Sequence, residues 1–261
     1  MSTASLNPTL EQAREQTSER KALRRAASAS FMGNFVEWFD YAAYGYLATV
    51  IALTFFPQTD KASALLTVHR RSVMIGIGVT CLNAVAFYLL LSYMPTYLST
   101  EMGMSESDSF LASTVSLATY IGLIFLMGKL SDRFGRKTML LTASVLFLVL
   151  TFPLFGMLEH QPLLVILMIQ IAFGAILAMN DGTLPCFLAE IFPTRVRFSG
   201  FAFSFNIANA VFGGTAPFIA TWLIQMTGNK MAPAWYLLAA AAVALVAMLA
   251  SRETAHKALQ D

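Results

Sequence analysis

Residues 128–137 read GKLSDRFGRK, a short stretch with five charged residues between two long apolar runs. These runs, near residues 108–128 and 138–158, contain almost no charged side chains. An α-helix rises about 1.5 Å per residue, so about 20 apolar residues cross a hydrocarbon core roughly 30 Å thick. The stretch therefore predicts two membrane-spanning helices joined by a charged loop.

The composition indicates that lipid surrounds most of the chain. Of its 261 residues, 57% are hydrophobic and 12% are charged, about half the charged share of roughly 25% in soluble domains. The apolar runs lack the two-residue alternation of barrel strands, so helices must satisfy the backbone in lipid. We therefore predict an all-α membrane protein with about seven transmembrane helices, near residues 30–56, 73–98, 108–128, 138–158, 162–189, 198–225 and 232–250.

The positions of Lys and Arg predict the orientation of these helices. From residue 57 onward, eleven of them fall on one side of the predicted helices and only Lys230 falls on the other. By the positive-inside rule, the last six helices form a block with both ends in the cytoplasm. The first helix is in conflict, because its two flanks carry five and three positive charges. The predicted organisation is a polar cytoplasm-type tail (1–29), a first helix (30–56), a junction loop (57–72), a six-helix block (73–250) and a cytoplasmic tail (251–261).

The loop 128–137 resembles the signature loop of the major facilitator superfamily, G-x-L-x-D-R-x-G-R-K/R, which that fold carries once in each six-helix half. Physically, Gly135 permits a tight turn, and Asp132 is expected at the N-terminus of a neighbouring helix, where negative charge is favoured. The basic residues hold the loop in the cytoplasm. The matching positions are Gly128, Asp132, Arg133, Gly135, Arg136 and Lys137.

Four shorter stretches resemble the metabolite:proton symporter family within that superfamily, and the chain looks closest to its proline/betaine branch. They are GNFVEWFDY (33–41), YMPTYL (93–98), FPTRVR (192–197) and MAPAWYL (231–237). The resemblance implies proton-coupled symport of a small polar or anionic metabolite, such as proline, betaine, 2-oxoglutarate, citrate or shikimate. It also implies a multi-pass protein of a bacterial-type inner (plasma) membrane.

The resemblance is uneven along the chain. Members of this family have twelve helices in two halves of six. Here residues 30–56 resemble the first family helix, whereas residues 73–250 resemble helices seven to twelve. The equivalents of helices two to six are therefore expected to be missing, with a join near Leu65–Arg71. Such a join accounts for the charge conflict, because the first helix should end outside and the next should begin inside.

Polar side chains on the first predicted helix are candidates for proton or cation coupling. Most of them share one face of a helix, within an arc of roughly 120°. An acidic residue inside the membrane is by default a functional-site hypothesis. The alternative is that the two acids lie at the level of the lipid headgroups. The candidates are Asn34, Glu37, Asp40, Tyr41 and Tyr44.

Further candidates lie in the six-helix block. Asp181 is expected either to line a cavity or to cap a helix break caused by Pro185. Asn206 and Asn209 share a helix face, which indicates helix packing, interhelical hydrogen bonds or cavity lining. Asn83 and Tyr88 are candidates for substrate contact, although intramembrane aromatic residues more often belong to an interfacial belt.

Two functional interpretations stay open. One is a proton-coupled carrier that works by alternating access between two repeats, which here requires a homodimer or a full-length transporter partner. The other is an internally deleted remnant that transports nothing. A retinal protein is disfavoured because residues 232–250 contain no lysine, and no protease or other enzyme motif is found, so we expect no enzyme. We expect no cofactor, metal site or nucleic-acid partner; the expected partners are the lipid bilayer, a small-molecule substrate and protons.

Overall fold

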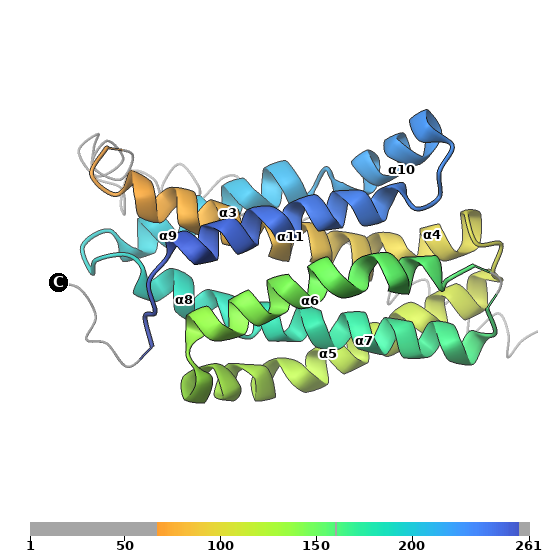
Figure 1. Ribbon diagram of the computed structural model, residues 1–261, viewed down its shortest axis with the longest axis horizontal. Coiled ribbons are helices and arrows are strands. Elements are labelled where there is room, and N and C mark those ends of the chain that lie inside the picture. The colour runs from red at the N-terminus through yellow and green to blue at the C-terminus, as the bar shows by residue number, and fades with distance from the viewer. Residues whose placement is uncertain (1–66, 160, 256–261) are drawn as a thin grey trace, which may run out of the picture. The chain divides into compact units, whose positions relative to one another are not determined.

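The computed structural model describes residues 67–159 and 161–255, all within one compact unit that covers Ala62–Asp261 (Figure 1). This part is helical and contains no strand, which confirms the all-α membrane fold. The first predicted helix (30–56) and the tail before it lie outside the described residues. The six predicted later helices match, within a few residues, six helices long and apolar enough to span a membrane: Arg70–Thr100, Glu106–Phe134, Arg136–Gly156, Leu163–Glu190, Arg197–Thr227 and Ala232–Ala250.

Three of the six spans are continuous helices and three are interrupted. The continuous ones are α5 (Glu106–Phe134), α6 (Arg136–Gly156) and α11 (Ala232–Ala250). The interrupted ones contain α3 (Arg70–Phe87), the π-helical segment η1 (Tyr88–Tyr93) and α4 (Met94–Thr100); α7 (Leu163–Asp181) and α8 (Leu184–Glu190); and α9 (Arg197–Ala208), the π-helical segment η2 (Asn209–Gly213) and α10 (Ala216–Thr227).

A proline explains the place of each interruption. Pro95, Pro185 and Pro217 each lie in the first turn of the second helix of their span. Proline has no N–H to donate, and its ring clashes with the carbonyl group four residues earlier. Four residues before Pro185 lies Asp181, the last residue of α7, and four before Pro217 lies Gly213, the last residue of η2. The end of α7 and the end of η2 therefore lie one turn before a proline, and η1 ends two residues before Pro95.

Helices α5 and α7 run parallel and pack through small residues of α7. A Cβ atom added to Gly174 would lie 2.7 Å from the carbonyl oxygen of Ser116. One added to Gly182 would lie 2.5 Å from the carbonyl oxygen of Ile124. Ala178, halfway between the two glycines, is fully buried. Small residues at every fourth position allow two membrane helices to approach at backbone distance, so α5 is held to the block by this seam.

Aromatic side chains fill the interior near the end of α4. The rings of Tyr97 and Phe155 meet edge to face with centroids 5.7 Å apart, and those of Phe155 and Phe173 do so at 5.6 Å. The Tyr97 hydroxyl donates to the carbonyl oxygen of Lys230 at 2.9 Å. A buried tyrosine needs such a polar partner for its hydroxyl, and here the bond connects α4 with the turn before α11.

The packing of α7 against α5 predicts different effects of two glycine-to-alanine changes. Gly174→Ala should lower the thermal stability of the purified chain, because the added methyl group meets the α5 backbone and overpacking costs about 1–3 kcal/mol. Gly122→Ala, in α5, is the matched control, since nothing lies within 4 Å of the added Cβ atom. It should leave stability unchanged or raise it by up to about 1 kcal/mol through helix propensity. Equal melting temperatures of the two variants in detergent would contradict this account of the seam.

Candidate functional site

The candidate residues predicted in the first helix fall outside the part of the chain that the structure describes. They are Asn34, Glu37, Asp40, Tyr41 and Tyr44. Their role in coupling stays a prediction. The remaining candidates all lie within the described residues, and the site is built from them.

Asp181 lies at the centre of a polar cluster between three spans. The hydroxyl of Tyr120, from α5, donates a hydrogen bond to the Asp181 carboxylate at the end of α7. The side chain of Asn83, from α3, faces the same carboxylate, although its amide nitrogen makes no hydrogen bond within 3.5 Å among the described residues. The structure thus brings together two predicted candidates, Asn83 and Asp181, and adds Tyr120.

Helix α7 is interrupted at Asp181, and the Asp181 side chain points toward α5. Helix α7 ends at Asp181, and α8 begins three residues later with Pro185 in its first turn. Among the described residues, no side chain caps the N-terminus of α8. Asp181 therefore does not act as a cap for the break; its carboxylate is turned to Tyr120. A carboxylate inside a membrane is costly to keep charged, which makes this cluster the leading candidate for proton binding.

Two buried amides on α7 add unused hydrogen-bonding capacity. Gln170 and Asn180 are fully buried, and neither the nitrogen nor the oxygen of either side-chain amide has a partner among the described residues. Buried polar groups are normally paired. The interior of the block therefore contains polar groups that have no hydrogen-bond partner among the described residues.

The two π-helical segments touch each other inside the block. A Cβ atom added to Gly213, the last residue of η2, would lie 2.7 Å from the ring of Tyr88, the first residue of η1. Tyr88 is thus packed against a neighbouring span. π-Helical turns often occur at functional sites. The contact places the predicted candidate Tyr88 between two irregular helices.

The two predicted amides of α9 and η2 bond to their own helix. The Asn206 amide donates to the carbonyl oxygen of Ala202 at 2.8 Å, and the Asn209 amide donates to that of Phe205 at 2.9 Å. Asn206 is exposed and Asn209 is half-buried. No interhelical hydrogen bond of either amide is found among the described residues, and their acceptor oxygens are free to meet a ligand.

The signature loop forms a second polar cluster, at the end of the block where α5 is followed by α6. Gly135 separates α5 from α6 with φ of 94°, a backbone conformation that side chains other than glycine rarely adopt. The loop brings the N-terminus of α6 onto the carboxylate of Glu253, which accepts from the backbone N–H groups of Arg136 at 2.9 Å and Lys137 at 3.1 Å. Glu253, and not Asp132 as predicted, thus occupies the helix N-terminus. Asp132 instead pairs with Arg136 at 2.6 Å.

Arg136 connects the loop to the end of α8. Its guanidinium group contacts Glu190 at 3.3 Å and donates to the hydroxyl of Ser131 at 2.8 Å. The hydroxyl of Thr254 donates to the other oxygen of Glu190 at 2.6 Å. The Lys137 ammonium donates to the carbonyl oxygen of Ser251 at 2.6 Å. The loop, α8 and the segment after α11 are therefore joined by charge-assisted hydrogen bonds.

Of the two remaining signature residues, Gly128 is closely packed and Arg133 is exposed. Gly128 lies against the α7–α8 break, since a Cβ atom added there would be 3.3 Å from the carbonyl oxygen of Gly182. Arg133 is exposed and lies 5.6 Å from the ring centroid of Phe134.

Within residues 67–159 and 161–255, no group of three His, Cys, Asp or Glu residues could hold a metal ion.

Comparison with known proteins agrees with this arrangement of helices and loop. The family model described as Major Facilitator Superfamily matches residues 76–260. The chain belongs to this superfamily. The match includes both the signature loop and the Asp181 cluster.

Three bacterial members of the superfamily illustrate the relationship. The proline/betaine transporter of Escherichia coli (strain K12) is 36% identical over 197 residues, which cover 74% of this chain and 39% of that protein. The ectoine/proline transporter ProP of Corynebacterium glutamicum is 37% identical over 196 residues, 73% of this chain and 38% of that protein. The citrate-proton symporter of Salmonella typhi is 33% identical over 197 residues, 73% of this chain and 44% of that protein.

These relatives support the predicted relationship to metabolite:proton symporters and indicate a transporter family rather than an enzyme family. The chain spans about two fifths of the length of the curated relatives it matches. Together with the six apolar helices, membership of the superfamily confirms a multi-pass protein of a bacterial-type inner (plasma) membrane.

The contact between Glu253 and α6 predicts a local effect of removing its charge. In this superfamily member, Glu253→Gln should speed amide hydrogen exchange at Arg136 and Lys137 by about tenfold, because hydrogen bonds to a charged acceptor contribute about 1.5–3 kcal/mol. Glu106→Gln is the control, since Glu106 lies in the first turn of α5 at the other end of the block. Unchanged exchange at Arg136 in the Glu253 variant would rule out this capping role.

The same contact predicts a pH dependence. Burial on its own raises the pKa of Glu253, but the backbone N–H groups of Ala255, Lys137, Thr254 and Arg136 outweigh it and hold the pKa below its ordinary 4.5. A carboxyl group with a lowered pKa in the folded state stabilises that state above its ordinary pKa and loses this effect as the pH falls through the lower value. Protection of the Arg136 amide, corrected for the intrinsic exchange rate, should thus be full above about pH 4.5 and decline below it. In Glu253→Gln this decline should be absent.

Proposed function

We propose that the chain supplies one six-helix half of a proton-coupled symporter for a small polar or anionic metabolite. The observation that carries the proposal is the Asp181 cluster, in which an intramembrane carboxylate accepts from Tyr120 and faces Asn83. One relative is named as a proline/betaine transporter and another as a citrate-proton symporter. These substrates fit the expected class.

In this proposal Asp181 carries the proton. When it is ionised, its oxygens accept from the Tyr120 hydroxyl; when it is protonated, it can donate a hydrogen bond and no longer needs that donor. Asn83, Tyr120 and Asp181 come from three different spans. Protonation of Asp181 therefore changes the hydrogen bonds that hold these spans together. Such a change in a contact between spans is what coupling of a proton to alternating access requires.

We assign substrate contact to the side of the block where the interrupted spans meet. Tyr88 and Gly213 pack together there, and Asn206 and Asn209 lie on the same span as Gly213. Interrupted helices leave backbone groups and half-helix ends available to a ligand, as in other secondary transporters. A zwitterionic substrate would place its positively charged group at the amide acceptor oxygens and its carboxylate at the tyrosine hydroxyls of this region.

A second six-helix block would complete the transporter. Only 22% of the most apolar stretch of α5 and 28% of that in Arg197–Thr227 is buried, against 67% in Arg70–Thr100. These two spans present large apolar side chains, among them Phe125 (78% exposed) and Phe218 (71% exposed). We propose that they face a second block, supplied by another copy of this chain or by a full-length relative, because alternating access needs two repeats.

Uptake into proteoliposomes tests the proposal. The full chain, reconstituted alone or with a full-length relative lacking its own activity, should accumulate labelled proline, betaine or citrate when an inward proton gradient is imposed. Asp181→Asn should reduce gradient-driven uptake at least about tenfold, because the proton site is lost, while exchange of labelled for unlabelled substrate without a gradient should persist.

Asp108→Asn is the matched control, since it removes a half-buried carboxylate in the first turn of α5, far from Asp181 in sequence. It should leave uptake unchanged. Equal gradient-driven uptake by Asp181→Asn and the unmodified chain would refute the role of Asp181. An absence of uptake in both reconstitutions would refute symport and favour the remnant interpretation.

A further inference from the structure

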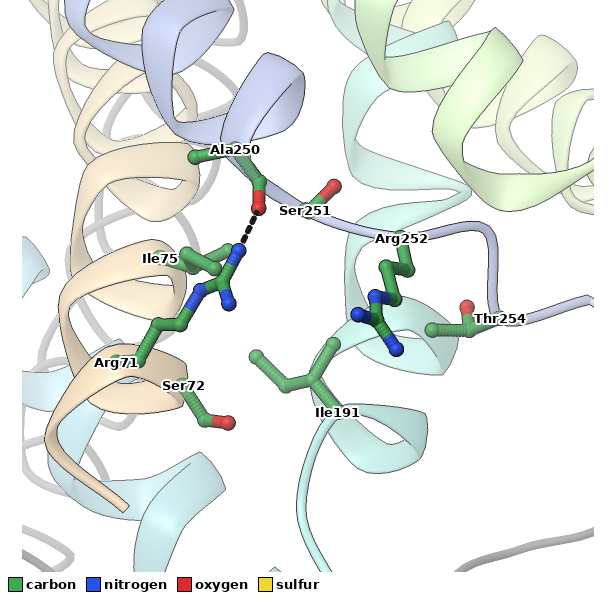
Figure 2. Close-up of a pocket in the computed structure, with 8 residues that line it drawn as sticks. All are labelled: Arg71, Ser72, Ile75, Ile191, Ala250, Ser251, Arg252 and Thr254. Atoms are coloured by element: carbon green, nitrogen blue, oxygen red, sulfur yellow. Dashed lines mark hydrogen bonds between the residues drawn. The ribbon is translucent and has the colours of Figure 1, made fainter. Parts of the chain in front are cut away.

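Two hollows meet at the cytoplasmic end of α3 and α11. One is a pocket of about 300 Å³ between α3, the end of α8 and the segment after α11 (Figure 2). The other is a groove of about 380 Å³ between α3 and α11. Both are lined by Arg71, Ile75 and Ala250, so the two hollows adjoin at these residues, and together they are called the recess here. Neither belongs to the Asp181 cluster or to the signature loop.

The pocket is positively charged. Figure 2 shows Arg71 reaching in from α3 and Arg252 from the segment after α11. Arg71 donates to the carbonyl oxygen of Ala250 at 2.9 Å, and Arg252 is exposed with no hydrogen bond or ion pair among the described residues. Arg70 lies at the mouth of the adjoining groove. Three guanidinium groups thus surround a recess whose lining, in the part of the chain described, includes no acidic residue.

The nearest carboxylates are engaged elsewhere. Glu253 follows Arg252 directly but accepts from the backbone of Arg136 and Lys137. Glu190 contacts Arg136 and accepts from Thr254. The charge of the pocket is therefore not neutralised by these neighbouring acids.

The groove has the opposite character. Apart from the arginines at its mouth it is lined by aliphatic and small residues, including Met74, Gly78, Val243 and Val246. Met74 is 72% exposed and Val246 is 67% exposed. At Gly78 the two helices approach closely, since an added Cβ atom would lie 2.9 Å from that of Ala247. Apolar surface on a membrane-spanning helix meets acyl chains, so the groove beside the charged pocket suits an acyl chain.

We propose that this recess binds one anionic phospholipid. Its phosphate group lies between Arg71 and Arg252, because guanidinium groups match phosphate oxygens with paired hydrogen bonds. One acyl chain lies in the groove between Met74 and Val246. A free phosphate ion would use the pocket alone, whereas a charged pocket with an apolar groove beside it suits a ligand with a charged head and an apolar tail. Anionic lipids are enriched in the cytoplasmic leaflet, on which this end of the block lies.

Native mass spectrometry of the full chain tests the proposal. The delipidated protein in neutral detergent is titrated with palmitoyl-oleoyl phosphatidylglycerol, with the matching phosphatidylcholine and with inorganic phosphate. We expect preferential retention of one phosphatidylglycerol. Arg252→Gln should weaken it at least about tenfold, because a charge-assisted hydrogen bond is lost, and Val246→Trp should weaken it by filling the groove.

Two matched variants control for charge and bulk. Arg195→Gln removes an exposed cytoplasmic arginine outside the recess, and Val149→Trp adds the same bulk to α6, where Val149 is 62% exposed. Both should bind lipid as the unmodified chain does. Arg252 makes no hydrogen bond or ion pair among the described residues, so its variant should keep the melting temperature of the parent chain.

Equal retention of the two lipids, or equal losses in Arg252→Gln and Arg195→Gln, would overturn the proposal. A combination of two other results would also overturn it: inorganic phosphate binds as tightly as the lipid, and Val246→Trp binds lipid as the unmodified chain does. The recess would then be a site for a free anion.

Discussion

The bilayer offers no hydrogen bonds to a peptide backbone, and the six described spans are arranged around that constraint. Continuous helices satisfy it within themselves. An interrupted helix does not, and irregular backbone at membrane depth is tolerated only where protein or a cavity covers it. Here Gly182, beside the α7–α8 break, is pressed against the α5 backbone at Ile124, and Gly213 of η2 is pressed against the ring of Tyr88 in η1. The breaks are thus enclosed by neighbouring spans.

The same constraint separates two kinds of polar site. At the end of the block that carries the signature loop, Arg136, Asp132, Glu190 and Glu253 pair with each other or with backbone groups. Inside the block, the polar side chains are only partly paired: Asp181 has Tyr120, but the amides of Gln170 and Asn180 have no partner among the described residues. A fully paired cluster fixes a structure, whereas a partly paired one keeps capacity for a proton or a ligand. This difference is why we assign function to the interior cluster.

The apolar runs and the signature loop predicted the six described spans and the turn at Gly135, because both depend on short stretches of sequence. The π-helical segment at Tyr88–Tyr93 could not be predicted, since no proline or glycine lies within it; Pro95 acts from the next turn. Tyr120 was missed because an isolated tyrosine in an apolar run fits many environments. Asn83 and Asp181 are 98 positions apart, and only the packing of α3, α5 and α7 brings them to Tyr120.

Glu253 and Glu190 were missed for a related reason, and their placement shows what the segment after α11 does. Glu253 lies outside every apolar run, and the signature loop contains its own carboxylate, Asp132, so proximity in sequence favoured the wrong partner for α6. The helix ends at Ala250, and Ser251 is extended, with φ of −85° and ψ of 166°. In this segment Glu253 turns to the N-terminus of α6, whereas Arg252 turns to the pocket beside α3. One short segment therefore connects α6 with α3, and a ligand held by Arg252 would also hold the carboxylate that caps α6.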